Sequence, residues 1–480
     1  MGFSRDVRDK RVFMVGIKGT GMASLACVLV DAGAEISGSD SQETFFTETL
    51  LEDKHIVCHN SFSEDNLDDS TDMVIYSTAY DKNNPYLAEA ERRHIPLYSY
   101  PQFLAEISKT STCYGVAGTH GKTTASAAAY SMLKPTGLPV FAVFGAPLLH
   151  PPYRTYDGDS IGILESCEYQ DHYLLYRMKG ALVTTIDFDH PDYFTDEGAV
   201  YDSFVSFCTR IESGGCVVIC VDEDKGSSLA KLVTRERKDL TVITYGTTRE
   251  ADFCMYDYRY EAFEGYYKIS SLDGTFISRL PGIPLTLDIV GAALLSASIV
   301  LLQDNLLTKE NLSKLPICSA MLREGERFHG CKGRSEALKL NDGIVLVNDY
   351  AHHPTEMSVT IESLRLRYPY QRIIVVFAPH TVSRTKALFD QFAEVLSSVD
   401  IVFVRDVYAS AREDGDRQSC RLLAESLARQ AGAQHIADEN ELCQTVLSML
   451  KPNDVCITMG AGNNKQLFHL LASKIRSGLR

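Results

Sequence analysis

A glycine-rich segment, residues 115–124, combines glycines, a lysine and threonines at spacings that suit anion chemistry. It reads Gly-Val-Ala-Gly-Thr-His-Gly-Lys-Thr-Thr, between a β-rich run and an alanine-rich helical run. The pattern predicts a strand, a turn and a helix start. Glycines let backbone N–H groups face an anion, and the helix N-terminus adds its dipole. We therefore expect a phosphate-binding turn, although Val116 stands where the strict pattern has its first glycine.

Two side chains of this segment would carry the chemistry. Lys122 would reach the β- and γ-phosphates of a nucleotide, and the Thr123 hydroxyl would bind Mg²⁺. The alternative is a glycine turn with an incidental lysine, which predicts that Lys122→Ala leaves ATP affinity and turnover intact. The expected ATP contacts here are Gly118, Thr119, His120, Gly121, Lys122, Thr123 and Thr124.

Acidic residues follow two further predicted strands in the same region. One strand ends at Glu165, and another leads into Asp187-Phe188-Asp189-His190. The carboxyl ends of parallel strands beside a phosphate-binding turn are where metal–phosphate chemistry belongs. Glu165 and His190 are therefore the candidate Mg²⁺ ligands beside Thr123. A solvated turn is the alternative for Glu168, Asp187 and Asp189.

A second glycine turn, Gly16-Ile17-Lys18-Gly19-Thr20-Gly21-Met22, follows a strand at 11–15. A helix and a second strand complete a βαβ pattern, and Asp40 stands at the strand tip where a ribose hydroxyl would be bound. Ser77 stands at the polar end of the next strand. A nicotinamide-dependent oxidoreductase is the rival interpretation, because a glycine turn alone is weak evidence for either function.

The C-terminal third gathers polar residues after its strands. One strand ends in Asp349-Tyr350-Ala351-His352-His353-Pro354-Thr355-Glu356, and another is followed by Pro379-His380 and then Arg384. A lone histidine is usually structural. Two adjacent histidines together with His380, Arg384 and Asp349 near strand ends favour a functional site.

Composition excludes several classes of function. The net charge of −16 over 480 residues argues against non-specific binding to nucleic acid or anionic membrane. We find no run of the ~18 apolar residues that a membrane span needs, and the charged N-terminus lacks a signal-like apolar region. Thirteen cysteines without a C-x-x-C pair predict free thiols in a cytoplasmic enzyme, not a disulfide or zinc framework.

Alternating strands and helices predict an α/β protein of three domains. A Rossmann-like domain would span residues 1–108, a central phosphate-loop domain with a mainly parallel sheet residues 109–318, and a second Rossmann-like domain residues 319–480. The length alone also suggests about three domains.

The motifs together resemble the Mur ligase family, over a range from residue 16 to residue 385. They are Gly16–Met22, Gly118–Thr124, Asp189-His190-Pro191-Asp192, Gly333-Arg334-Ser335-Glu336, the segment 349–356, and Pro379-His380 through Arg384-Thr385.

The resemblance implies an ATP-dependent ligase of peptidoglycan precursor synthesis. ATP would phosphorylate the carboxylate of UDP-N-acetylmuramate, and the amine of L-alanine would attack the acyl phosphate to give the amide, ADP and phosphate. Mg²⁺ and Lys122 would screen the repulsion between the carboxylate and the γ-phosphate. The resemblance also implies a cytoplasmic monomer or weak homodimer that binds neither nucleic acid nor membrane.

The resemblance assigns roles residue by residue. Gly19, Thr20, Gly21 and Met22 would line the UDP site, with Asp40 and Ser77 beside them. Arg334 would approach the ATP phosphates and Asp349 the ribose, and His380 and Arg384 would hold the carboxylate of the amino acid, with Tyr350 and His352 nearby. The catalytic set would be Lys122, Arg334, His352, His380 and Arg384.

Some positions depart from the family pattern. The family has an H-N-x-x-N pattern with an asparagine that reads adenine, and Pro284, Leu285 and Asp288 stand at the matching positions here, so the adenine-reading residue is left open. Lys18 stands where glycine is usual, Thr185 where asparagine is common, and Thr381 where some members carry arginine.

Two other functions are alternatives to L-alanine ligation. The near alternative is attachment of a recycled tripeptide to the same sugar nucleotide, and a further one is a non-catalytic nucleotide-binding switch.

Overall fold

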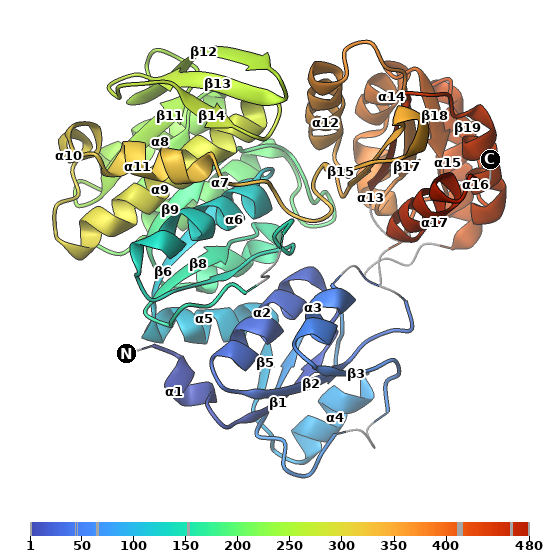
Figure 1. Cartoon of the computed structure of the whole chain (residues 1–480). Coiled ribbons are helices and arrows are strands. Elements are labelled where there is room, and N and C mark those ends of the chain that lie inside the picture. Colours follow the sequence, from blue (N-terminus) through green and yellow to red (C-terminus); the bar gives the residue numbers. More distant parts are fainter. Residues whose placement is uncertain are drawn as a thin grey trace. The chain divides into compact units, whose positions relative to one another are not determined.

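The computed structural model describes residues 2–43, 45, 47–63, 67–150, 154–409, 416–460 and 464–478 (Figure 1). These residues divide into two compact units. The first comprises residues 1–188 and 196–329, and the second comprises 189–195 and 330–480. The short segment 189–195 therefore belongs with the C-terminal residues although it is far from them in sequence.

The N-terminal part of the first unit is a parallel sheet in the order β3-β2-β1-β4-β5. Its core forms where apolar residues of β1 and β4, such as Phe13 and Val74, pack on Tyr86 and Leu87. The helix that follows β1 begins directly at the predicted glycine turn. The elements are α1 Ser4–Val7, β1 Arg11–Val15, α2 Thr20–Asp31, β2 Glu35–Ser39, α3 Glu48–Asp53, β3 Val57–His59, β4 Met73–Tyr76, α4 Pro85–Arg92, β5 Leu97–Ser99 and α5 Tyr100–Thr110.

The second sheet of this unit has the order β14-β13-β12-β11-β10-β9-β6-β8-β7. Strands β6 to β12 pair in parallel, and β13 and β14 extend the sheet from β12 in the antiparallel sense. The strands are β6 Thr112–Ala117, β7 Val140–Val143, β8 Ile161–Glu165, β9 Met178–Val183, β10 Cys216–Cys220, β11 Thr241–Gly246, β12 Phe253–Glu261, β13 Glu264–Ile269 and β14 Phe276–Ser278.

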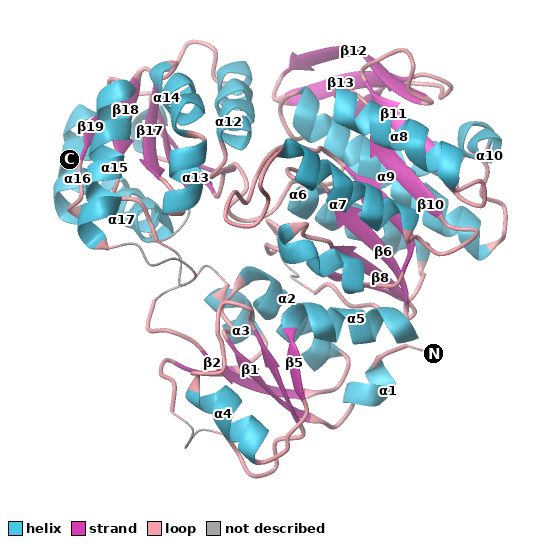
Figure 2. Cartoon of the chain, turned by 180° about the vertical axis from the view of Figure 1, so that it is seen from behind, coloured by secondary structure: helices cyan, strands magenta, loops and turns pink. Residues whose placement is uncertain are grey.

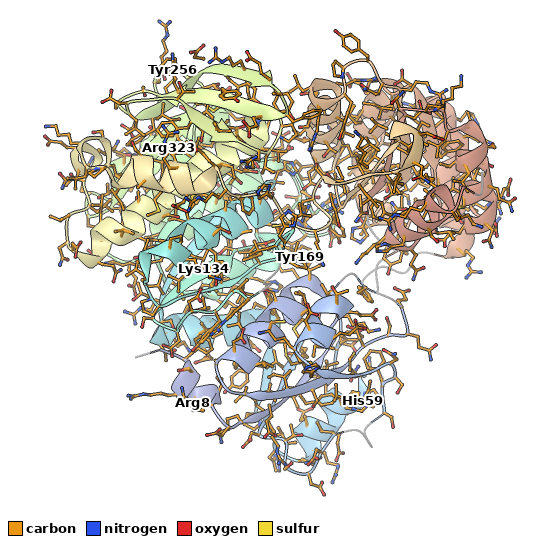
Figure 3. The ribbon with its side chains drawn as sticks, in the orientation of Figure 1. Arg8, His59, Lys134, Tyr169, Tyr256 and Arg323 are labelled. Carbon is orange, nitrogen blue, oxygen red and sulfur yellow. The ribbon has the colours of Figure 1, made fainter. Side chains whose placement is uncertain are left out.

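Helices cover this second sheet (Figure 2). They are α6 Lys122–Leu133, α7 Glu197–Thr209, α8 Asp224–Glu236, α9 Ile283–Gln303, α10 Lys309–Lys314 and α11 Ile317–Gly325, with the short 3₁₀ segments η2 Lys134–Thr136 and η3 Tyr169–Leu175. Figure 3 shows Tyr256 projecting from the antiparallel extension, where its side chain is half exposed. Arg323 of α11 lies over the ring of Phe276, with 4.7 Å to the ring centre.

Helix α9 corrects the expectation that no run is apolar and long enough to span a membrane. This helix has 21 residues, and the mean hydropathy of 2.2 in its 18-residue apolar window meets that criterion. However, 83% of its apolar window is buried inside the protein, where it packs on α6 and α11. A helix that is apolar on all sides can equally be the central helix of a large core, and α9 is of that kind.

The second unit is built on the sheet β15-β16-β20-β17-β18-β19, in which β15 alone pairs in the antiparallel sense among the described strands. Its strands are β15 Glu336–Lys339, β16 Val345–Asp349, β17 Ile373–Ala378, β18 Ile401–Val404, β19 Gln434–His435 and β20 Val455–Gly460. Its helices are α12 Pro354–Arg367, α13 Val382–Ala387, α14 Phe389–Ser397, α15 Arg417–Gln430, α16 Glu439–Met449 and α17 Asn464–Arg476, with the 3₁₀ segment η4 Asn341–Gly343.

Within the described part of the chain every cysteine is free, as the sequence predicted. Most are buried, and burial raises the pKa of several thiols, including Cys113, Cys208 and Cys456. Such thiols behave as small apolar side chains and are poor nucleophiles.

Candidate active site

The phosphate-binding turn has the strand–turn–helix form that the sequence predicted. Strand β6 leads through Gly118 to Gly121, which caps α6 with a left-handed φ of +81°. A Cβ at Gly118 would lie 2.0 Å from the Thr184 hydroxyl, and a Cβ at Gly121 would lie 2.3 Å from an oxygen of Asp288. Both positions therefore need glycine, because the backbone passes too close to neighbouring atoms for any side chain.

Lys122 starts α6 and pairs with a buried acid. Its ammonium lies 3.0 Å from Glu168 Oε2, and Glu168 is only 1% exposed. The ammonium also donates to the carbonyls of Gly118 and Thr119. Burial lowers the pKa of Lys122, but Glu168 outweighs this effect and the net shift is upward. The lysine is therefore charged, and Glu168 is not the solvated turn residue that was its alternative.

Thr123 and Glu165 lie together as the sequence predicted. The Thr123 hydroxyl donates to Glu165 Oε2 at 3.0 Å, and the backbone N–H of Gly145 donates to the same oxygen at 2.7 Å. A hydroxyl and a carboxylate beside a phosphate-binding turn are hard oxygen donors of the kind that Mg²⁺ prefers. These two residues fit the predicted metal. His190 belongs to the second unit, so its part in that site stays a prediction.

The loop after β9 braces the phosphate-binding turn. The His120 backbone N–H donates to the Thr185 hydroxyl at 2.9 Å, and the Thr184 hydroxyl donates to the His120 carbonyl. The His120 ring lies 3.0 Å from a carboxylate oxygen of Asp187. Asp187 therefore positions the imidazole rather than standing alone in solvent, which the sequence did not predict.

Asp288 on α9 is a buried carboxyl group facing the same turn. Desolvation raises its pKa from 3.8 to about 7, and the charge of His120 opposes this only in part. Cys220 of β10 and Tyr245 of β11 also interact electrostatically with Asp288, and neither is a cation. The carboxyl group is therefore partly protonated near neutral pH.

Folding stability should depend on pH through Asp288. Its pKa is higher in the folded than in the unfolded chain, so the contribution to stability is complete below about pH 4 and is lost as pH rises toward 7. Each pKa unit corresponds to about 1.4 kcal/mol. We expect Asp288→Asn to gain stability relative to wild type by roughly 2 kcal/mol between pH 5 and pH 7.

Urea unfolding of both proteins at each pH measures this difference. Asp304→Asn, at the exposed end of the same helix, is the matched control and should show no such trend. A stability difference between the Asp288 variant and wild type that is the same at pH 5 and pH 8 would contradict the assignment.

The first glycine turn is held by Asp40. Asp40 Oδ2 accepts the backbone N–H of Lys18 at 2.7 Å, and Oδ1 accepts from the Tyr80 hydroxyl at 3.0 Å and the Ser41 N–H at 2.8 Å. Ser77 lies against Gly16. A Cβ added to Gly16 would be 2.8 Å from the Cβ of Ser77. The structure thus brings Asp40 and Ser77 to the glycine turn, with Asp40 already engaged inside the protein.

Lys18, which departs from the family pattern, is buried beneath this turn. Its ammonium lies 2.6 Å from Glu48 Oε1 and donates to the carbonyls of Ser41 and Glu43. The side chain therefore ties the glycine turn to the segment that leads into α3. Its ammonium is therefore a structural cation, and its backbone N–H donates a hydrogen bond to Asp40 Oδ2.

In the second unit, the carboxylate of Asp349 at the end of β16 also accepts hydrogen bonds from neighbouring residues. Its Oδ2 accepts from the Ser335 N–H at 3.0 Å and from the Thr360 hydroxyl at 3.0 Å, and Oδ1 accepts from the Ala351 N–H at 2.8 Å. Burial raises the pKa of Asp349 while Arg334 lowers it. Its part in ribose binding stays a prediction.

The predicted amino-acid site forms one cluster. The rings of Tyr350 and His352 lie 5.1 Å apart, those of His352 and His380 lie 5.6 Å apart, and Arg384 Nη1 lies 3.3 Å from His380 Nδ1. The Arg334 guanidinium lies over the Tyr350 ring at 5.2 Å. The tyrosine and histidines follow the parallel strands β16 and β17, whose carboxyl ends lie at one edge of the sheet. Arg334 precedes β15, and because β15 is antiparallel its start lies at the same edge.

Arg384 has a partner that the sequence did not reveal. Its Nε and Nη2 donate to the two oxygens of Asp189 at 2.7 and 3.1 Å, in a pair whose side chains are 4% and 8% exposed. Desolvation would raise the pKa of Asp189, but His190 and Arg384 hold it well below its usual range. Asp189 is therefore a buried charged partner, and the solvated-turn alternative is wrong for it.

The two adjacent histidines have different roles. His353 is buried at the N-cap of α12 and accepts the Thr355 N–H at 3.2 Å, so it is structural. Burial and then Arg384 lower the pKa of His352 to about 4, so its imidazole is neutral near pH 7. Its Nδ1 lies 2.9 Å from the Tyr350 carbonyl, which can only accept, so Nδ1 carries the proton and Nε2 is left as an acceptor.

Family models match most of this chain. The Mur ligase family, catalytic domain model matches residues 11–112, the Mur ligase middle domain model residues 116–287, and the Mur ligase, glutamate ligase domain model residues 333–462. The chain belongs to the Mur ligase family. Membership accounts for the three sheets, and the prediction of a three-domain α/β fold with mainly parallel sheets is confirmed.

Mur ligases similar to this chain over its full length include two bacterial proteins. UDP-N-acetylmuramate--L-alanine ligase of Treponema pallidum is 33% identical over 472 residues, covering 97% of each chain. The protein of the same name from Desulfitobacterium hafniense is 34% identical over 463 residues, covering 94% of this chain and 97% of its own.

Solved Mur ligase structures share the fold. UDP-N-acetylmuramate-alanine ligase MurC of Thermotoga maritima aligns with a TM-score of 0.78 at 20% identity, over 98% of this chain and 99% of its own. A murein peptide ligase of Psychrobacter arcticus aligns with a TM-score of 0.69 at 18% identity, over 97% and 98%. At these identities the likeness shows the fold alone.

Proposed function

We propose that this Mur ligase joins L-alanine to the carboxylate of UDP-N-acetylmuramate with conversion of ATP to ADP and phosphate. The single observation that carries the proposal is the full-length similarity to the L-alanine ligases of Treponema pallidum and Desulfitobacterium hafniense. The geometry supports it, because a glycine turn leads into α6 at Lys122, Thr123 and Glu165 offer hard oxygen donors beside that turn, and buried Arg384 lies beside His380. A cytoplasmic location and a monomer or weak homodimer belong to the same proposal.

The first step is activation of the acid. A carboxylate oxygen attacks the γ-phosphorus of ATP, the bond to the ADP oxygen breaks, and an acyl phosphate forms. The charged ammonium of Lys122 and the N-terminus of α6 stabilise the negative charge that accumulates on the transferred group. Mg²⁺ bound by Thr123 and Glu165 would supply further charge neutralisation. The two residues are already 3.0 Å apart, so little reorganisation is needed.

The second step forms the amide. The amine nitrogen of L-alanine attacks the acyl carbon, phosphate leaves with the electron pair, and the nitrogen loses a proton. In the second unit, the third guanidinium nitrogen of Arg384 is directed at His380 and is not used by Asp189, so it can hold the amino acid's carboxylate. Neutral His352, with its free Nε2 acceptor, is suited to hydrogen bond an ammonium or amine.

Substrate-dependent phosphate release tests the proposal. Purified protein with ATP, Mg²⁺ and UDP-N-acetylmuramate should release phosphate only when L-alanine is added. Release with the recycled tripeptide and not with L-alanine would instead support the peptide-attaching alternative, as in the murein peptide ligase whose fold is similar. A nicotinamide absorbance change without phosphate release would support the oxidoreductase, which family membership disfavours.

A further inference from the structure

Tyr100 is held rigidly at a junction within the first unit. It is the first residue of α5 and follows β5 directly. Ser99 caps this helix in a capping box, because its hydroxyl accepts the Gln102 N–H at 3.4 Å and its own N–H donates to Gln102 Oε1 at 2.8 Å. Pro101 restricts the first turn further. The backbone of Tyr100 is therefore fixed by local hydrogen bonds on both sides.

The Tyr100 ring lies against the first glycine turn. A Cβ built on Gly21 would lie 2.6 Å from the Tyr100 hydroxyl oxygen and 2.7 Å from Cζ. Gly21 belongs to the first turn of α2, which is the predicted site of the sugar nucleotide. The phenol thus occupies the space that any larger residue at position 21 would need.

Tyr100 also interacts electrostatically with residues at and after the end of β8. Burial raises the pKa of Tyr100 well above 10, and Tyr176, Glu165 and Cys167 add to that shift. The phenol therefore stays protonated and is a donor at any working pH. Among the residues that the structure describes, none accepts a hydrogen bond from it. The residue as a whole retains some solvent exposure.

These contacts place one donor between two sites of the first unit. The glycine turn lies against the Tyr100 ring. Helix α2, which starts at that turn, accepts the Phe144 N–H on its Ser24 hydroxyl, and the neighbouring Gly145 N–H donates to Glu165, which bonds the Thr123 hydroxyl. The charge of Glu165 also acts on the Tyr100 phenol. A sugar nucleotide bound at the glycine turn must bring its carboxylate toward Thr123 and Lys122. The negative charges of Glu165 and Glu168 oppose the arrival of another carboxylate there, and a neutral O–H offsets that repulsion without competing for Mg²⁺.

We propose that the Tyr100 hydroxyl donates a hydrogen bond to the carboxylate of the sugar nucleotide and orients it for phosphorylation. This inference rests on the proposed function and adds a substrate-positioning residue to it. The donor acts on the acid and not on ATP, so its loss should change turnover and leave nucleotide binding unaffected.

The test is Tyr100→Phe, which removes the hydroxyl and keeps the ring against Gly21. We expect kcat with UDP-N-acetylmuramate and L-alanine to fall roughly tenfold to a hundredfold, since one donor to a reacting oxygen is lost. The KM for ATP should stay within about twofold of wild type. Tyr98→Phe is the matched control, because Tyr98 of β5 packs edge-on against Phe103 of α5 and its loss of a hydroxyl should leave the rate unchanged.

A second variant separates hydrogen bonding from packing. Incorporation of 4-aminophenylalanine at position 100 restores an N–H donor on the same ring, so it should recover most of the rate that Tyr100→Phe loses. Equal rates for Tyr100→Phe and Tyr98→Phe, in a preparation whose wild-type protein forms the amide, would overturn the inference. A lost rate that 4-aminophenylalanine does not restore would also overturn it. Wild-type protein that forms no amide would instead refute the proposed function.

Discussion

Replacing Lys122 by methionine is expected to reduce turnover by roughly three orders of magnitude. Lys122 is the cation at the N-terminus of α6, and its ammonium donates to Glu168 and to the carbonyls of Gly118 and Thr119. Methionine keeps the apolar stem and removes the charge. The transferred phosphoryl group then loses its fixed positive partner, so both the KM for ATP and kcat should change.

The same substitution also removes the Lys122 ammonium from buried Glu168. Removing one member of a buried ion pair typically costs about 3–5 kcal/mol of folding stability. The double variant Lys122→Met/Glu168→Gln should therefore recover most of the stability and none of the activity. Steady-state kinetics and thermal unfolding on both variants separate the two effects.

Lys134 provides the matched control for Lys122. It follows the same helix, is exposed, and lies 5.9 Å from the centre of the Tyr130 ring. Lys134→Met should leave turnover within about twofold of wild type, because an exposed cation contributes little. If Lys122→Met retained turnover within tenfold of wild type, the incidental-lysine interpretation would be correct.

Replacing Arg384 by methionine is the second change with a large expected effect. It should raise the KM for L-alanine by about a hundredfold and destabilise the second unit by about 3–5 kcal/mol. The KM rises because Nη1, the nitrogen proposed to hold the L-alanine carboxylate, is lost. Stability falls because Asp189 is left as a buried carboxylate without its bidentate arginine. Arg384→Lys should restore charge but not the two parallel hydrogen bonds, so recovery should be partial.

Arg372 offers a matched control in the same unit. It makes a similar two-point contact with Asp454, at 3.1 and 2.6 Å, away from the histidine cluster. Arg372→Met should lower stability without changing the KM for L-alanine. Equal effects of the two substitutions on that KM would show that Arg384 acts only through stability. L-alanine titrations followed by phosphate release, together with thermal unfolding, provide both measurements.

Features encoded in adjacent residues were predictable from the sequence. The phosphate-binding turn needs a strand, glycines that tolerate positive φ, and a helix start, and all three lie within residues 112–133. The cluster of Tyr350, His352, His380 and Arg384 was also predictable, because parallel strands bring their carboxyl ends to one edge.

Features that depend on distant pairs were not predictable. Asp189 and Arg384 are 195 residues apart, and nothing local to either indicates that they form a buried pair. Tyr100 meets Gly21 only because the N-terminal sheet and α5 fold together. The helical capping role of His353 had a local signal, since Pro354 follows it at the first position of α12. The apolar composition of α9 was visible in the sequence, but its burial required the fold.

The most direct test of this account follows an oxygen atom. UDP-N-acetylmuramate labelled with ¹⁸O in its carboxylate would be converted with ATP, Mg²⁺ and L-alanine, and the inorganic phosphate analysed by mass spectrometry. An acyl phosphate intermediate predicts that one labelled oxygen appears in the phosphate for each amide formed. Unlabelled phosphate accompanying amide formation would contradict the central claim that the acid is activated by phosphorylation.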